Sequence, residues 1–379
     1  MNAAVIKRGN RYAVRLDLGR GPGGKRIYKW HSGYPTRRAA QQARTELLGA
    51  LDHNTYVPPD KTTLAQYLRQ QWLPTIATQV RPGTWAEYRS KAEKHLIPAL
   101  GQVALQQLTT AMLNALYKDL LERGTGPRTV QYVHATIRKA LNDAARWGLL
   151  TRNPALHATP PKRRHQELNT WTAEQLRQFL QAVEGERLYA AWRLGALTGM
   201  RRGELLGLRW SDLDLDQGWL SVRQALVVVD RQVQVSQPKT ARGRRLIALD
   251  PGTIAALRAH RTQQAKERLV LGPAWSAGEL VFTREDGQPL HPDWFRRRFE
   301  RRARRAGLPP IRLHDLRHTH ATLALQAGVH PKVVSERLGH ATVAMTLDIY
   351  SHAIPALQHD AAATIADLVS GVAAAGGLG

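Results

Sequence analysis

Two proline-bearing stretches constrain the fold more than any other feature of this 379-residue chain. The first is YVPPDKTT, from Tyr56 to Thr63, and the second is NPALHATPPKRRHQ, from Asn153 to Gln166. Proline cannot donate a backbone hydrogen bond, so such stretches interrupt helices and sheets. A chain of this length is also too long for one ordinary core. We predict domains at 1–58, 63–160 and 168–365, with a flexible tail at 366–379, in a fold that is mainly α with small β elements.

The N-terminal part alternates polar and apolar residues as β-strands do. RYAVRLDL and KRIYKWHSGY are joined by the turn GRGPGG, and a helix is expected from Thr36, its N-cap, to about Leu51. We predict a small three-stranded sheet plus a helix. The stretch GRGPGGK resembles a phosphate-binding loop, but Arg26 stands where Ser or Thr is required and the loop opens no helix. Residues 1–58 contain eleven Lys and Arg against three Asp and Glu, and this excess of positive charge suits a sheet that contacts a DNA groove.

Residues 63–160 show helical periodicity throughout, and we predict a compact bundle of about four helices. One helix is expected to begin with Thr84 as N-cap, and another to end at Gly148. The second of these has an apolar stripe made of Val130, Val133, Ile137, Leu141 and Ala144. A charged run on a helix is usually only a solvated face. The candidate phosphate contacts are nevertheless Arg81, Arg89, Lys91, Lys94, Arg128, Arg138 and Lys139.

Residues 168–365 are expected to mix helices with a few antiparallel strands, read from WLSVRQALVVV and RQVQVSQPKTARGRRLIAL. The run RRRFERRARR, from Arg296 to Arg305, predicts a helix with one buried edge formed by Trp294, Phe295 and Phe299. Its arginines are expected to contact DNA phosphates or to balance acids of the domain. Such contacts position a protein on DNA without reading its bases.

The balance of charge narrows the class of partner. Lys and Arg outnumber Asp and Glu by 55 to 30, a formal charge of +25, which favours a polyanion over the alternative of a solubility feature. The absence of cysteine excludes disulfides, zinc–thiolate sites and thiol nucleophiles. The N-terminus MNAAVIKRGNRYAV lacks the apolar segment of a signal peptide, and no apolar run has membrane-spanning length. We therefore expect a soluble, cytoplasmic or nucleoid-associated protein without a membrane partner.

The stretch IRLHDLRHTHATLALQAG contains three histidines, which raises the possibility of a metal site. The spacing of His314 and His318 can bind a metal from one helix face. However, HExxH is missing, Asp315 is surrounded by arginines, and no carboxylate pair suits two-metal chemistry. We therefore expect no metal and no other cofactor.

The alternative is a phosphate site. His314 and Arg317 are i, i+3 neighbours on one helix turn, so a proton donor and a two-pronged phosphate ligand would lie together. Three further stretches add candidates: Arg201 and Glu204 in TGMRRGELLGLRW, Lys239 in the predicted hairpin QPKTARGRR, and His340 and Tyr350 in ERLGHATVAMTLDIYSH. A phenol attacks poorly at neutral pH unless a cationic pocket stabilises the phenolate and the transition state. This inventory suits metal-free phosphoryl transfer to a protein nucleophile.

TGMRRGELLGL, HDLRHTHAT and LGH…TLDIYSH resemble, in order and spacing, the motifs of the tyrosine recombinase (phage integrase) family. The resemblance covers nearly the whole chain and implies an arm-type DNA-binding domain, a helical SAM-like core-binding domain and a catalytic domain. It implies that Tyr350 is the nucleophile, and that Arg201, Lys239, His314, Arg317 and His340 surround the scissile phosphate. The chain looks most like the integrases of temperate phages and integrative elements.

Some assignments stay open at this level. Arg242, Arg244 or Arg245 could serve in place of Lys239, and Arg242 and Arg244 are also candidate DNA contacts. Arg202 could be taken for Arg201, but the Gly-x-Arg-x-x-Glu spacing favours Arg201. Glu204 and Asp315 are expected to orient the reacting groups.

The resemblance implies a reaction through a 3′-phosphotyrosine and a Holliday junction, without ATP or metal. It also implies a homo-tetramer on double-stranded attachment sites, and host DNA-bending or directionality factors are further candidate partners. The helix-prone stretch ALQHDAAATIADLVSG after Tyr350 is a candidate for packing onto a neighbouring subunit. The competing hypotheses are a type IB-like topoisomerase and a non-catalytic DNA-binding regulator.

Overall fold

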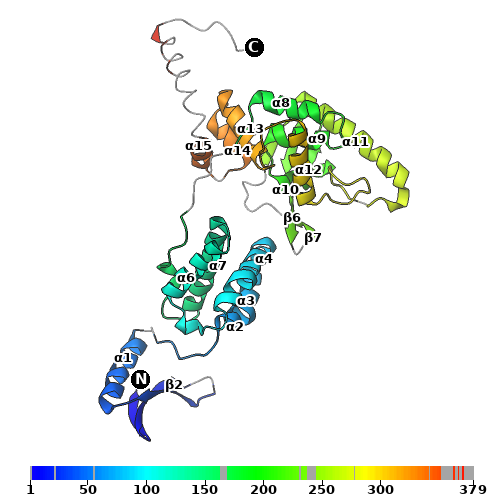
Figure 1. The fold of residues 1–379 in the computed structure, drawn as a ribbon. Coiled ribbons are helices and arrows are strands. Elements are labelled where there is room, and N and C mark those ends of the chain that lie inside the picture. Colours follow the sequence, from blue (N-terminus) through cyan, green and yellow to red (C-terminus); the bar gives the residue numbers. More distant parts are fainter. Residues whose placement is uncertain are drawn as a thin grey trace. The chain divides into compact units, whose positions relative to one another are not determined.

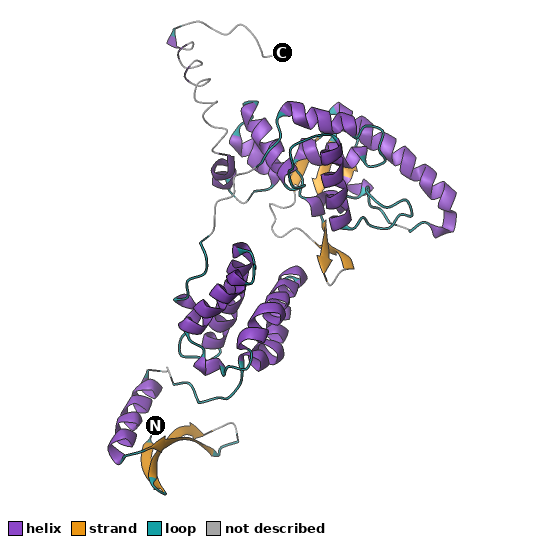
Figure 2. Cartoon of the chain, in the orientation of Figure 1, coloured by secondary structure: helices purple, strands orange, loops and turns teal. Residues whose placement is uncertain are grey.

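A computed structural model describes the chain over 2–20, 23–53, 56–162, 169–229, 232–236, 245–276, 278–340 and 342–350, and at 362, 366 and 369–370. The chain divides into two compact units, Met1–His165 and Gln166–Gly379. Helices dominate, and the strands described form small antiparallel sheets (Figure 1, Figure 2). Among the described residues, no helix is both long and apolar enough to cross a bilayer.

The N-terminal sheet consists of β1 (Ala3–Arg8), β2 (Arg11–Arg20) and β3 (Arg26–Tyr34), paired antiparallel in that order. Helix α1 (Arg37–Asp52) covers one face, on which Val14 and Leu16 are buried. The Thr36 side chain accepts a hydrogen bond from the Ala39 N–H at 3.1 Å, which confirms the predicted N-cap. The predicted three-stranded sheet and helix are confirmed.

Aromatic and guanidinium groups stack on this sheet. The Arg8 guanidinium lies 4.2 Å from the centre of the Trp30 ring, and that of Arg15 lies 4.8 Å from the Tyr28 ring. Both rings are exposed. Stacking holds the two cations in place at the surface without neutralising their charge.

A helical bundle follows, built from four helical segments within 64–146. They are α2 (Leu64–Gln66) continuing through the π-helical η1 (Tyr67–Trp72) into α3 (Leu73–Ala77); α4 (Pro82–Lys91) continuing through the π-helical η2 (Ala92–Leu96) into α5 (Ile97–Leu100); α6 (Thr110–Glu122), preceded by the 3₁₀ turn η3 (Leu105–Gln107); and α7 (Pro127–Arg146). All five residues of the predicted α7 stripe are fully buried, and Gly148 follows the helix with φ +74°. The predicted bundle and stripe are confirmed.

One boundary prediction was wrong. Helix α4 begins at Pro82 after the extended Arg81, so Thr84 lies inside it and is no N-cap; proline suits the first helical position because its missing N–H would be unpaired there. The beginning of the second proline-bearing stretch packs on the bundle. The Asn153 side chain donates to the Arg138 carbonyl at 3.0 Å and to Asn142 Oδ1 at 2.7 Å, and the 3₁₀ turn η4 (Pro154–Leu156) follows it.

The C-terminal unit is a mixed domain with α9 at its centre, in contact with α8, α10, α11 and α13. In chain order its elements are α8 (Ala173–Ala182), α9 (Tyr189–Thr198), α10 (Arg202–Leu206), η5 (Trp210–Asp212), β4 (Leu213–Asp214), β5 (Trp219–Val222), β6 (Ala225–Val229), β7 (Gln232–Ser236), β8 (Arg245–Ala248), α11 (Pro251–Leu271), η7 (Gly272–Ala274), α12 (Pro292–Arg305), α13 (Asp315–Gln326), α14 (Pro331–Leu338) and α15 (Val343–Tyr350). The order β4-β5-β8 forms one antiparallel sheet, and β6-β7 a hairpin. The expected antiparallel strands are confirmed.

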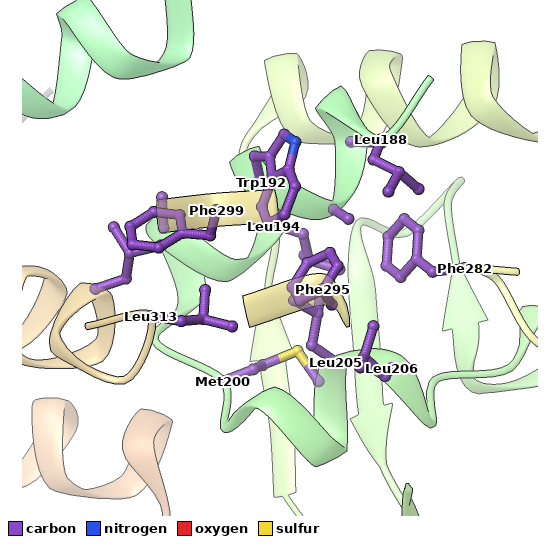
Figure 3. Close-up of a cluster of buried hydrophobic side chains, with 14 of the residues drawn as sticks. Leu188, Trp192, Leu194, Met200, Leu205, Leu206, Phe282, Phe295, Phe299 and Leu313 are labelled. Carbon is purple, nitrogen blue, oxygen red and sulfur yellow. The ribbon is translucent and has the colours of Figure 1, made fainter. Parts of the chain in front are cut away.

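The core of this unit combines packed aromatic rings with aliphatic side chains (Figure 3). Trp192 of α9 stacks on Phe295 of α12 at 4.2 Å between ring centres, and Phe299 lies 6.1 Å from the same indole. Phe295 and Phe299 therefore form the buried edge predicted for the arginine-rich helix. Trp294 does not belong to it, because this residue is 41% exposed and one position along a helix turns the side chain by about 100°.

The arginines of α12 divide into two groups. Arg296 pairs with Glu300 on the same helix, and Arg298 and Arg302 pair with Glu186. Arg297, Arg301, Arg304 and Arg305 are exposed. One group therefore balances acids of the domain, and the other presents positive charge to solvent.

Candidate active site

Arg201 lies at the start of α10, where the chain turns from α9. Its Nη1 donates to Glu204 Oε1 at 2.7 Å, and its backbone N–H donates to Glu204 Oε2 at 3.0 Å. The Arg201 Nη2 donates further, to the Gly339 carbonyl at 3.0 Å. The side chain remains 42% exposed, so it is oriented by the protein and still reaches solvent.

Arg317 lies in the first turn of α13 and is buried. Its Nη1 donates to the Gly199 carbonyl at 2.8 Å and its Nη2 to the Leu338 carbonyl at 2.7 Å. Gly199 ends α9 with φ +63°, and a Cβ there would lie 2.6 Å from Leu338 Cδ2 and 2.9 Å from His320 Cδ2. Only glycine permits both this backbone conformation and this close approach.

Arginines from three elements meet at the C-terminal end of α14. Arg245 Nε donates to the Arg337 carbonyl at 2.6 Å, Arg317 to the Leu338 carbonyl and Arg201 to the Gly339 carbonyl. The last carbonyls of a helix have no partner within the helix and carry its negative dipole end. Three guanidinium groups therefore occupy three successive carbonyls directly before His340.

His340 follows the left-handed Gly339 that ends α14. Its Nδ1 lies 2.8 Å from the Thr346 Oγ1 of α15, and its backbone N–H donates to the Ser335 carbonyl at 3.0 Å. Burial, and then the charges of Arg317 and Arg201, lower the pKa of His340 to about 4. The imidazole is therefore neutral at pH 7.

Two histidines of α13 lie beside this cluster. The rings of His314 and His318 meet edge-on at 5.1 Å between centres. Desolvation by the surrounding protein, and then the charge of Arg317, lower the pKa of His314, although its ring still reaches solvent. Burial and the neighbouring His314 lower the pKa of His318 to about 4. The structure thus brings Arg201, His314, Arg317 and His340 together from three places in the sequence.

Glu204 is bonded to two arginines. The side chain is 8% exposed and accepts from Arg201 and from Arg245 Nη2, the latter at 2.9 Å. Burial alone would raise the pKa of Glu204, but the hydrogen bonds and charges of Arg245 and Arg201 bring it below its ordinary value. The buried carboxylate is therefore ionised and ties the two guanidinium groups to each other.

Asp315 acts on a different group. Its carboxylate accepts from the backbone N–H of Arg312 at 2.8 Å and from Arg312 Nη2 at 2.7 Å. It therefore fixes the turn that enters α13 and holds Arg312. Arg202 donates to Asp293 and to the Pro292 carbonyl of α12, which separates it from the cluster formed by Arg201.

Part of the predicted site lies outside the described residues. Lys239, Arg242 and Arg244 belong to 237–244, and the segment after Tyr350 belongs largely to 351–368. Tyr350 is the last residue of α15, and only its backbone is described. The element that carries Tyr350 is nevertheless tied to the cluster, because Thr346 of the same helix contacts His340.

The candidate phosphate contacts of the bundle differ in how they are engaged. Lys139 Nζ lies 2.6 Å from the buried Asp143, so this ammonium already has an internal counter-ion. Lys91 lies 3.8 Å from Glu87, and Arg89 stacks on Trp85 at 4.6 Å. Arg81, Lys94, Arg128 and Arg138 are exposed.

Arg245 is the residue whose role the sequence did not disclose. It appeared there only as a substitute for Lys239, yet its side chain is 6% exposed and bonded to Glu204 and to a backbone carbonyl. Strand alternation was the available signal. Arg245 shares a face of β8 with the buried Ile247, while Leu246 between them is exposed.

In the described ranges, no three His, Cys, Asp or Glu side chains are grouped so as to hold a metal ion. His320, the third histidine of the run, has a buried Nε2 without a hydrogen-bond partner. Burial lowers its pKa to about 4.

Three family models match successive parts of the chain. The model of the phage integrase family matches residues 169–356, that of the phage integrase N-terminal SAM-like domain matches 63–121, and that of an arm DNA-binding domain matches 5–51. Each match falls on one of the three segments into which the prolines divide the sequence.

Individual relatives agree with these matches. A protein named tyrosine recombinase XerC-like, from Caldanaerobacter subterraneus subsp. tengcongensis, is 27% identical over 383 residues, covering 96% of this chain and 98% of its own. The ICEBs1 integrase of Bacillus subtilis is 27% identical over 302 residues, covering 79% of this chain and 81% of its own. In fold, the chain resembles a lambda integrase solved as a tetramer bound to a Holliday junction. The TM-score is 0.59 at 22% identity, over 91% of this chain and 93% of the other.

Proposed function

The chain belongs to the phage integrase family of tyrosine recombinases, and on this premise we propose that it integrates and excises a mobile genetic element by cutting and rejoining DNA at attachment sites. The observation that carries the proposal is the convergence of Arg201, Arg317 and His340 at the end of α14, beside the helix that ends at Tyr350. These groups suit a phosphodiester whose negative charge grows in the transition state.

In the first step, the phenolic oxygen of Tyr350 attacks phosphorus. A Tyr350 Oη–P bond forms and the P–O5′ bond breaks, leaving a 3′-phosphotyrosine and a free 5′ hydroxyl. Lys239 donates the proton that the departing oxygen requires, and the phenol loses its own proton to the surroundings. The phosphotyrosine ester keeps the phosphate activated, so the step needs neither ATP nor a metal ion.

His340 has a specific part in this step. A neutral imidazole carries one N–H, and the Thr346 hydroxyl 2.8 Å from Nδ1 can donate to that nitrogen. The proton then sits on Nε2, which can donate to a non-bridging phosphate oxygen. Arg201, which remains accessible, and Arg317 hold the same oxygens, and His314 completes the set.

In the second step, a 5′ hydroxyl of another strand attacks the phosphotyrosine, releases Tyr350 and seals the DNA in a recombined arrangement. Two such exchanges pass through a Holliday junction and require four active sites. We therefore propose that four copies of this chain assemble on DNA.

Covalent trapping tests the chemistry. The attachment sequence is obtained from the junctions between the genetic element and its host chromosome. A duplex of that sequence, nicked so that the cleaved piece diffuses away, should accumulate a protein–DNA adduct. Tyr350→Phe should bind the duplex and form none, whereas absence of an adduct with the wild-type protein would leave only a DNA-binding regulator.

A second assay separates an integrase from a type IB-like topoisomerase. Two attachment sites on one plasmid should yield recombinant products with the wild-type protein. Relaxation of supercoils without recombinants would favour the topoisomerase.

A further inference from the structure

Arg245, the first residue of β8, is a buried arginine that the reaction above does not use. Its Nη2 donates to Glu204 Oε2 at 2.9 Å and its Nε to the Arg337 carbonyl at 2.6 Å. A guanidinium group is costly to bury, so a buried one needs charge and hydrogen-bond partners. Here those partners belong to α10, which begins directly after Arg201, and to α14, which ends just before Gly339 and His340.

The two bonds join the site along two routes. Through Glu204, Arg245 reaches Arg201, because the same carboxylate accepts from the Arg201 side chain and its backbone N–H. Through the Arg337 carbonyl, it holds the last turn of α14, from which Gly339 leads to His340. The approach is close, since a Cβ on Gly339 would lie 3.0 Å from Arg245 Nη1.

We propose that Arg245 is a positioning residue of the recombinase. It holds Arg201 and His340 in the relative placement that the scissile phosphate requires, without contacting DNA. This inference rests on the proposed function, because it assigns a role within the same reaction.

The alternative role, that of proton donor in place of Lys239, does not fit the geometry. The Arg245 side chain is 6% exposed and is committed to a carboxylate and a carbonyl. An arginine also retains its proton up to very high pH, which makes it a poor acid. Its charge still acts at a distance, as it is among the charges that keep the pKa of His340 low.

The planar fork of arginine explains why this residue type is needed. Nε and Nη2 lie in one plane and donate along fixed directions, so a single side chain bridges α10 and α14. A lysine at this position would keep the charge beside Glu204, but its single ammonium group cannot reproduce this rigid bridge. Lysine should therefore restore charge compensation but only part of the positioning.

The experiment measures single-turnover cleavage of the nicked duplex, and separately the Kd for the intact duplex. Arg245→Ala should slow cleavage about 100-fold, the loss that a small misplacement of reacting groups can cause, with an unchanged Kd. Arg245→Lys should fall between alanine and wild type. The acid limb of the pH–rate profile should move to higher pH in Arg245→Ala, because His340 then lies near one cation fewer.

Arg187 provides a matched control in the same unit. It is a largely buried arginine bonded to Glu267 at 2.6 Å and to the Thr283 carbonyl at 2.7 Å, partners that are different from those of Arg245. Arg187→Ala should lower the unfolding temperature and leave the cleavage rate per folded molecule unchanged.

Three results would overturn the inference: wild-type rates in Arg245→Ala, a loss of affinity in place of rate, or an equal rate loss in Arg187→Ala. If Arg245→Ala does not fold, the lysine variant decides, and a wild-type rate there rejects the positioning role. Failure of the wild-type protein to form an adduct would instead reject the proposed function itself.

Discussion

Asp143 in the helical bundle and Glu204 in the C-terminal unit are both buried carboxylates that pair with two cations. They differ in where those cations come from and in what else the cations bond. The side chain of Asp143 is 2% exposed and accepts from Lys139, Arg146 and the Trp72 indole N–H. Burial raises the pKa of Asp143, but hydrogen bonds from Lys139 and Trp72 bring it below its ordinary value. Both cations come from its own helix, one turn on either side.

At Glu204 one cation comes from the same turn and the other from a strand 41 positions away. Each guanidinium then donates beyond the carboxylate, to a carbonyl at the end of α14. The Asp143 cluster therefore links α7 to the helical segment that carries Trp72, and it stabilises the packing of these two helices. The two arginines at Glu204 instead also bond to the end of α14, which leads to the His340 imidazole.

Arginine-to-alanine substitutions at the two clusters should show the largest contrast. Arg201→Ala should lower the rate of adduct formation about 10²–10³-fold, the usual effect of removing one donor to transition-state charge. Arg146→Ala should change the rate little, since its partner Asp143 keeps Lys139. Single-turnover trapping measures both, and a comparable rate loss in Arg146→Ala would remove the distinction between the clusters.

Glycines with positive φ give a second contrast. Gly199→Ala should lower the free energy of unfolding by about 1–2 kcal/mol for the left-handed backbone, and by a further 1–3 kcal/mol or so for overlap with Leu338 and His320. Gly148→Ala in the bundle has φ +74° and no atom within 4 Å of the added Cβ, so only the first cost applies. Denaturant unfolding of the variants measures the difference. Equal losses would mean that the Gly199 approach is not tight in solution.

As the pH falls, the C-terminal unit should begin to lose stability at a higher pH than the Asp143 cluster of the bundle does. The pKa of His320 is about 4 in the folded protein against an ordinary 6.5, so the unfolded chain binds more protons between these values. The stability from neutral His320 is complete above pH 6.5 and is lost as the pH falls toward 4. The lowered pKa of Asp143 makes its contribution last until the pH falls below the ordinary 3.8.

The measurement compares unfolding temperatures at pH 7 and pH 5. His320→Leu should lose less stability over this interval than the wild type, because one buried titrating group is gone. His157→Gln, at an exposed histidine, should behave as the wild type does. An unchanged slope in His320→Leu would contradict the assignment.

The smallest expected effect is on the salt dependence of DNA binding, through contacts between the bundle and DNA phosphates. Arg138→Ala should reduce the slope of log K against log salt by about 1, as loss of one phosphate contact does. Lys139→Ala, one position along, should leave the slope unchanged, because its ammonium pairs with Asp143. Binding titrations at several salt concentrations decide, and equal slopes in both variants would show that Arg138 contacts no phosphate.

The sequence predicted what depends on neighbours a few positions apart. The Thr36 cap, the α7 stripe and the strand–turn–strand of β2 and β3 follow from side chains within one turn or one pleat of each other. The same holds for the Arg201–Glu204 pair, three residues apart. The wrong prediction of Thr84 as N-cap also has a local cause, because Pro82 begins the helix two positions before Thr84.

What the sequence by itself determined was the kind of elements in each stretch, an N-terminal sheet with a helix, a helical bundle and a mixed C-terminal part, and which side chains are chemically able to act on a phosphate. Only the tertiary structure decided that Trp294 faces solvent, that Asn153 bonds to the Arg138 carbonyl, and that Arg245 joins α10 to α14. Short-range hydrogen bonds and periodicity are written in consecutive residues. The partner of a buried charge depends on how elements distant in the sequence pack together, and a local sequence pattern does not predict that packing.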